Sequence, residues 1–167
     1  TARLPWLLIG MIGGIGNSMI LGNFDSTFAA HPEMALYIPL IGGTGGNVGT
    51  QSSALVVQGL ANSSLDAKNT FKQVSKEAVV ALINATIISL LVYTYNFIRF
   101  GATATVTYSV SISLFSVVMF ASIFGTLVPM TLEKMKIDPA IATGPFIAIT
   151  NDIIGMMMYM GITVLLS

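Results

Sequence analysis

A carboxylate stands near the middle of an apolar run close to the C-terminal end of the sequence. The run reads TGPFIAITNDIIGMMMYMG over residues 143–161, and Asp152 is its only charged residue. An aspartate at the centre of a bilayer costs about 2.5–3.5 kcal/mol, so we expect it to face the protein interior and to be matched by positive charge. No lysine or arginine stands at the same depth in another apolar run, which leaves a cation, a proton or water as the partner. The alternative is a protonated Asp152 that is hydrogen-bonded to Asn151 or Thr150.

A glycine-rich stretch earlier in the chain combines flexibility with polar side chains. Residues 39–51 read PLIGGTGGNVGTQ. A phosphate-binding loop would need a lysine after its last glycine, and a dinucleotide-binding fingerprint would need a glycine where Val48 stands, so both are excluded. Pro39 and the glycines instead predict a helix interrupted near its middle, which a bilayer tolerates only where the backbone is buried in protein or lines a watery cavity. The alternative is a kinked helix whose glycines only pack.

Both segments offer oxygen ligands of the kind that hard cations prefer. Unwound carbonyls of the glycine stretch would join the side chains of Asn47, Thr50 and Gln51. Mg²⁺ dehydrates reluctantly and commonly keeps several waters beside one or two carboxylates, whereas Ca²⁺ usually takes more direct oxygens. These residues therefore predict Mg²⁺, and ligand type alone does not separate Mn²⁺ from it. Small residues share a helix face with Asp152 and leave room for a hydrated ion: Gly144, Ala148 and Gly155.

Other kinds of chemistry are excluded by what the composition lacks. The 167 residues include no cysteine and one histidine, His31, so thiolate nucleophiles, zinc sites and serine–histidine pairs have no support. The formal net charge is zero, which gives nucleic-acid binding no support either. We expect a protein that is not an enzyme.

Apolar stretches must position the polar residues within a lipid bilayer. Hydrophobic residues make up 54% of the chain and charged ones 8%, a composition that is not typical of soluble domains. Helices of about 20 residues are long enough to cross the hydrocarbon core, and five such stretches predict an all-α, multi-pass membrane domain that occupies residues 1–167. The expected spans cover residues 5–24, 34–60, 78–97, 106–132 and 141–166.

Lysine and arginine are distributed unevenly between the expected loops. Six of the seven basic residues fall on one side of the membrane, and Arg99 falls on the other. Because positively charged short loops stay in the cytoplasm, we expect the N-terminus and both basic loops there, with the C-terminus outside the cell membrane. The six residues are Arg3, Lys68, Lys72, Lys76, Lys134 and Lys136.

We further expect two chains to pair. Five spans with one central carboxylate are too few to enclose a polar pore, and twofold dimers are the commonest oligomers. In such a homodimer the two Asp152 side chains would approach one axis, where a divalent cation relieves the repulsion between them.

Four segments carry a family resemblance: RLPWLL at 3–8, IPLIGGTGGNVGTQS at 38–52, DPA at 138–140 and GPFIAITNDIIG at 144–155. With them the chain resembles, over its whole length, the transmembrane domain of the MgtE family of magnesium channels and transporters. The resemblance implies a five-helix domain that forms a homodimer, with the ion pathway at the interface and cytoplasmic regulatory domains upstream. A sequence that begins with Thr1 rather than Met fits that expectation.

The resemblance also implies functional residues. Asp152 would bind a hydrated Mg²⁺, assisted by backbone oxygens near Gly43, Asn47 and Ala148. Two cytoplasmic carboxylates, Glu77 and Asp138, would bind regulatory Mg²⁺ between this domain and the upstream ones. The residues alone support a simpler interpretation of that pair, because acidic side chains are favoured near helix N-termini.

The sequence thus predicts a homodimeric channel or transporter that conducts hydrated Mg²⁺ through a pore with a central aspartate. Two other functions stay open. The first is a proton- or sodium-coupled carrier of divalent cations, because broken helices that meet at the midplane are also typical of secondary transporters. A membrane anchor that transports nothing is the other.

Overall fold

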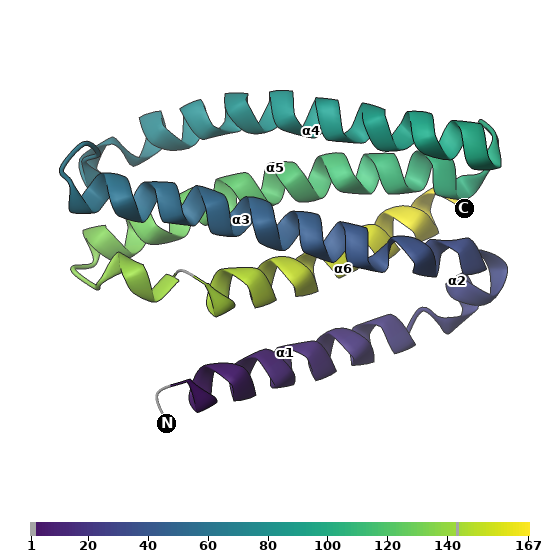
Figure 1. The fold of residues 1–167 in the computed structure, drawn as a ribbon, viewed down its shortest axis with the longest axis horizontal. Helices are drawn as coiled ribbons and strands as arrows, with labels where there is room; N and C mark the ends of the chain where they lie inside the picture. The colour runs from purple at the N-terminus through teal and green to yellow at the C-terminus, as the bar shows by residue number, and fades with distance from the viewer. Residues whose placement is uncertain (1–2, 143) are drawn as a thin grey trace.

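The computed structural model describes residues 3–142 and 144–167, and every regular element within these ranges is helical (Figure 1). This confirms the all-α prediction for the described residues. Six α-helices are joined in part by three short 3-10 helices. In chain order the elements are α1 (Leu4–Gly22), α2 (Asp25–Ala30), η1 (Pro32–Tyr37), α3 (Ile38–Ala61), η2 (Ala67–Asn69), α4 (Thr70–Phe100), α5 (Thr105–Lys134), η3 (Pro139–Ala142) and α6 (Pro145–Leu166).

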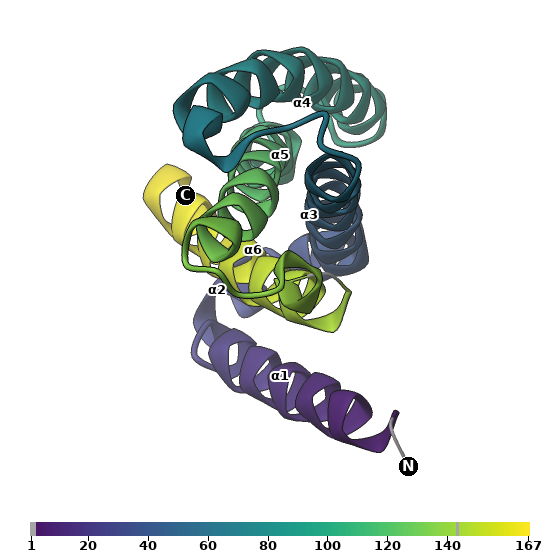
Figure 2. The same ribbon diagram turned by 90° about the vertical axis from the view of Figure 1, so that its left-hand side faces the viewer.

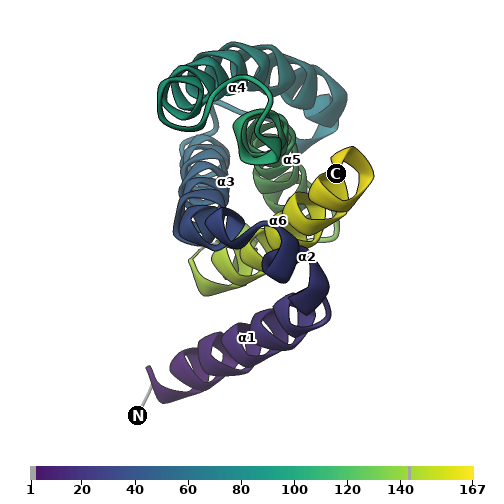
Figure 3. The same ribbon diagram turned by 90° about the vertical axis from the view of Figure 1, so that its right-hand side faces the viewer.

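The helix α5 occupies the centre of the bundle. It packs against α3, α4 and α6, which surround it in the end-on view of Figure 2. By contrast, α1 packs mainly on α6 and contains no buried residue, and it stands apart from the other long helices in Figures 2 and 3. The helix α6 therefore lies between α1 and the rest of the bundle.

The connections between the long helices lie at the two ends of the bundle. Figure 1 shows the N-terminus, the α3–α4 connection and the α5–α6 connection at one end, and the C-terminus with the α4–α5 connection at the other. The basic loops therefore share one end. This is the arrangement of loops that the charge distribution predicts.

Among the described residues, four helical stretches are long and apolar enough to cross a membrane, which confirms four of the five expected spans on length and composition. The helix α3 has 24 residues and so measures about 36 Å at a rise of 1.5 Å per residue, enough to cross a bilayer. Its glycines and polar side chains make it less apolar than the others, and a fifth crossing by α3 stays a prediction. The four stretches are Leu4–Gly22, Ala67–Phe100, Thr105–Lys134 and Pro145–Leu166.

The helix α3 is continuous from Ile38 to Ala61, so the predicted interruption of the second span is wrong. Because η1 fills the preceding residues, α3 begins later than expected and Pro39 falls in its first turn, where the missing N–H would have no helical partner in any case. Packing requires the small size of two of these glycines, because a Cβ added at Gly45 would lie 2.8 Å from Val117 of α5 and one added at Gly49 would overlap the Asn151 side chain of α6. A Cβ added at Gly125 of α5 would lie only 2.5 Å from the carbonyl oxygen of Gly49. Close packing thus compensates for the low helix propensity of glycine.

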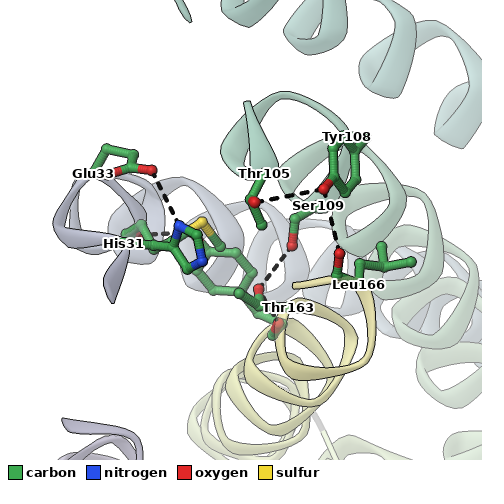
Figure 4. A network of polar contacts seen from close by, with 9 residues as sticks. His31, Glu33, Thr105, Tyr108, Ser109, Thr163 and Leu166 are labelled. Atoms are coloured by element: carbon green, nitrogen blue, oxygen red, sulfur yellow. Dashed lines mark hydrogen bonds and ion pairs between the residues drawn. The ribbon is translucent and has the colours of Figure 1, made fainter. Parts of the chain in front are cut away.

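Hydrogen bonds join α5 and α6 at the end of the bundle that holds the C-terminus (Figure 4). The hydroxyls of Ser109 and Thr163 lie 2.8 Å apart, and the Tyr108 hydroxyl donates to the carbonyl of Leu166 at 3.3 Å. Polar side chains that bond across helices are a common means of association in membranes, where apolar contact alone provides little preference over lipid.

The segment η1 fixes the start of α3 relative to its neighbours. The buried Tyr159 hydroxyl of α6 donates to the carbonyl of Met34 at 2.7 Å, and the Tyr37 hydroxyl donates to the side-chain oxygen of Asn96 on α4. These bonds hold η1, which leads directly into α3, against α4 and α6. They help to set which residues of α3 lie beside the middle of α6.

Candidate cation site

Asp152 lies on α6 with its carboxylate against α3. A Cβ added at either Gly42 or Gly46 would stand 3.5 Å from Asp152 Oδ1. These two glycines are one helical turn apart, so α3 presents a strip of bare backbone to the carboxylate. The structure thus brings the glycine-rich segment and the aspartate together, although the segment is not unwound.

No side chain neutralises this carboxylate in the part of the chain that the structure describes. Asp152 is half-buried and has neither a hydrogen bond nor an ion pair there. The Thr150 hydroxyl donates to the carbonyl of Phe146 at 2.8 Å, and the Asn151 side chain has no hydrogen-bond partner among the described residues. The alternative of Asp152 bonded to Asn151 or Thr150 is therefore not the arrangement observed. The carboxylate is free to bind a cation or water.

A hollow of about 70 Å³ opens beside Asp152 on the side of α1. A Cβ added at Gly13 would overlap the side chain of Ile149, whereas one added at Gly10 or Gly14 would meet nothing within 4 Å. Packing therefore accounts for Gly13, and the other two glycines leave space near the carboxylate. The hollow is lined by Gly10, Gly13, Gly14 and Asn17 of α1 and by Ile149 and Asp152 of α6.

Sequence reasoning missed Asn17 as a residue of this site. Its side-chain oxygen is buried and has no hydrogen-bond partner among the described residues. The signal that could have identified it is its spacing, because Asn17 follows Gly13 and Gly14 by four and three residues and so shares their helix face.

The resemblance implies ligands from the backbone oxygens of three residues, and each residue stands one helical turn from Asp152 or next to a glycine that lies beside it. Gly43 and Asn47 directly follow the two glycines that contact Asp152, and both are exposed on α3. Ala148 is half-buried on α6 one turn before Asp152. All three stand in regular helices, where a carbonyl that accepts a helical hydrogen bond keeps a second lone pair. Each of their oxygens could therefore accept one further hydrogen bond, such as one from a water of a hydrated ion.

The small-residue face predicted around Asp152 is only partly open. Gly155 is buried, and a Cβ added there would contact Val117 at 3.7 Å and Ile41 at 3.9 Å. Gly144 caps the start of α6 with a φ of 66°, which favours glycine over residues that carry a side chain. Gly155 thus packs against α3 and α5 and does not border open space.

The two carboxylates proposed for regulation make separate local contacts. Glu77 Oε1 accepts a 2.8 Å hydrogen bond from the Ser52 hydroxyl of α3, and Asp138 Oδ1 accepts a 3.0 Å bond from the backbone N–H of Ala140. The second contact is the helix-start chemistry that the residues alone suggest. No group of three or more histidine, cysteine or acidic side chains that could hold a metal occurs within the described ranges. A regulatory site would need ligands from elsewhere, and it stays a prediction.

Comparisons relate the chain to known proteins. A family model named MgtE and described as a divalent cation transporter matches residues 38–162. The chain is 32% identical over 160 residues to the magnesium transporter MgtE of Bacillus subtilis, which covers 96% of this chain and 35% of that protein. It is also 32% identical over 165 residues to the magnesium transporter MgtE of Thermus thermophilus, which covers 99% of this chain and 36% of that protein. The chain therefore spans about a third of the length of the curated relatives that it matches.

Proposed function

Because this chain belongs to the MgtE family of divalent cation transporters, we propose that it conducts hydrated Mg²⁺ across the cell membrane along a pathway that passes Asp152. One observation carries the proposal. An unpaired carboxylate in a membrane-spanning helix lies beside a strip of bare α3 backbone and a hollow lined in part by three glycines of α1. A membrane-embedded charge of this kind requires a cationic or aqueous partner.

The chemistry of the site suits Mg²⁺ better than a cation that sheds its water easily. Mg²⁺ usually keeps several waters and binds one or two carboxylates, and this site offers one carboxylate per chain. The carbonyls of Gly43, Asn47 and Ala148 would accept hydrogen bonds from those waters. Mn²⁺ takes the same oxygen ligands and is expected to be transported as well.

The pathway is proposed to lie between two copies of the chain. The face of α3 that continues from Gly42 and Gly46 is exposed at Gly43 and Asn47, so a second copy could cover it. We place the basic end of the bundle in the cytoplasm, as the loop charges favour. Cytoplasmic regulatory domains of the same gene product would then act at that end, close to Glu77 and Asp138.

Uptake into liposomes tests this function. The full-length protein, reconstituted with a Mg²⁺-sensitive dye inside the vesicles, is expected to admit Mg²⁺ when a Mg²⁺ gradient is the only driving force. A coupled carrier would need a proton or sodium gradient as well, and a membrane anchor would admit no Mg²⁺. Either of those two results, in vesicles shown to contain folded protein, would reject the channel assignment.

The strip of bare backbone on α3 gives a more local prediction. A methyl group added by Gly46→Ala would stand in contact with Asp152 Oδ1 and displace water from the carboxylate, so we expect Mg²⁺ uptake to fall about tenfold, the effect of one lost hydrogen bond. Gly161→Ala on α6 is the matched control, because a Cβ there meets nothing within 4 Å. Equal uptake by the two variants would show that the strip does not border the pathway.

A further inference from the structure

The side chain of Asn17 gives α1 a part in the cation site. We propose that the Asn17 carboxamide oxygen accepts a hydrogen bond from a water of the hydrated cation that Asp152 attracts, so that α1 and α6 hold the ion between them. This inference rests on the function proposed above. It adds a residue from α1, whereas the glycine-rich segment belongs to α3 and Asp152 to α6.

The hollow brings the two side chains together. Asn17 and Asp152 are the only residues with polar side chains among the six that line it. The remaining lining comes from three glycines of α1 and from Ile149, which stands one turn before Asp152. Two polar side chains at a space otherwise lined by glycine and one isoleucine are close enough to share a ligand that fills the space.

The hydrogen-bonding state of Asn17 indicates what that ligand must supply. Its oxygen is buried and has no donor among the described residues, and a buried acceptor without a donor destabilises the folded state. The carboxylate of Asp152 cannot donate to it while ionised. A water held by a divalent cation satisfies both groups, since its positive metal is attracted to Asp152 and its polarised O–H donates to Asn17.

The packing of α1 explains how Asn17 is held at this depth. The helix rests mainly on α6, and Gly13 permits close contact with Ile149, where a Cβ would overlap the isoleucine side chain. One turn after Gly13, the next residue of the same face is Asn17. A close contact at Gly13 therefore places the carboxamide beside the turn of α6 that carries Asp152.

Transport kinetics in liposomes test the role of Asn17. We expect Asn17→Ala to raise the Mg²⁺ concentration for half-maximal uptake about tenfold, as for the loss of one water-mediated hydrogen bond. Hexaamminecobalt(III), a cation with six inert N–H-donating ligands, should inhibit wild-type uptake and bind about tenfold more weakly to the variant. Asn23→Ala, an exposed asparagine at the end of the same helix, is the matched control and should behave as wild type.

A second variant keeps the test decisive if Asn17→Ala fails to fold. Asn17→Asp places a second carboxylate in the hollow and should lower the half-maximal Mg²⁺ concentration about tenfold or more. If the folded Asn17 variants keep the wild-type half-maximal concentration and Asp152→Asn still abolishes uptake, the role of Asn17 is rejected and the function proposed above is not. Absence of uptake by the wild type would instead reject the proposed function itself.

Discussion

We expect Asp152→Asn to abolish Mg²⁺ uptake. The substitution keeps the shape of the side chain and removes its charge, and attraction between opposite unit charges about 4 Å apart amounts to roughly 4 kcal/mol near a protein surface. Loss of that attraction for a divalent ion corresponds to a fall in uptake of at least about 100-fold. Fluorescence of a Mg²⁺-sensitive dye in liposomes is the measurement.

The controls for this variant separate loss of the site from loss of the fold. Asp25→Asn makes the same chemical change at an exposed position of α2 and should leave uptake unchanged. Asp152→Glu keeps the charge but changes its reach, so it should retain part of the uptake with an altered preference among divalent ions. Wild-type uptake by a well-folded Asp152→Asn protein would contradict the site.

The largest effect on stability is expected from Gly125→Ala. A Cβ at this position would lie 2.5 Å from the Gly49 carbonyl oxygen and 3.1 Å from Ser52 Cβ. The obstacle is largely backbone, so α3 and α5 must move apart along the contact that forms the middle of the bundle. Overpacking of this kind costs about 1–3 kcal/mol, which a lower melting temperature in mild detergent would report.

Gly161→Ala again provides the comparison, since its Cβ would meet nothing within 4 Å. We expect that protein to melt at the wild-type temperature or slightly above, because alanine has the higher helix propensity. If Gly125→Ala melts no lower than Gly161→Ala, the close approach of α3 and α5 is not a feature of the folded protein.

The helical fold and four of its spans could be predicted from apolar length alone, but the continuity of α3 could not. The sequence places a proline and several glycines together, and each weakens a helix by local propensity. What decides the outcome is where the helix begins and what packs on it. Pro39 became harmless once η1 displaced the start of α3 to Ile38, and the contact between Gly49 and Gly125 involves residues far apart in the chain.

The candidate site could be predicted only as far as depth in the membrane. Asp152 and the glycine stretch both fall near the middle of the spans expected from the sequence, and the structure places them side by side. The rotation of α3 about its axis decides that Gly42 and Gly46 contact the carboxylate, whereas Gly43 and Asn47 lie on the exposed side. That rotation depends on the packing of whole helices. The placement of Asn17 of α1 at the hollow beside Asp152 has the same origin.

The position of a bound divalent ion tests the central claim most directly. Mn²⁺ accepts the same oxygen ligands as Mg²⁺, and its anomalous X-ray scattering locates it in crystals of the full-length protein. We predict a Mn²⁺ peak at the Asp152 carboxylate, between α1 and the Gly42–Gly46 strip of α3, that is absent from crystals of Asp152→Asn. A membrane-domain peak remote from Asp152, or one that persists beside residue 152 in the asparagine variant, would contradict the account.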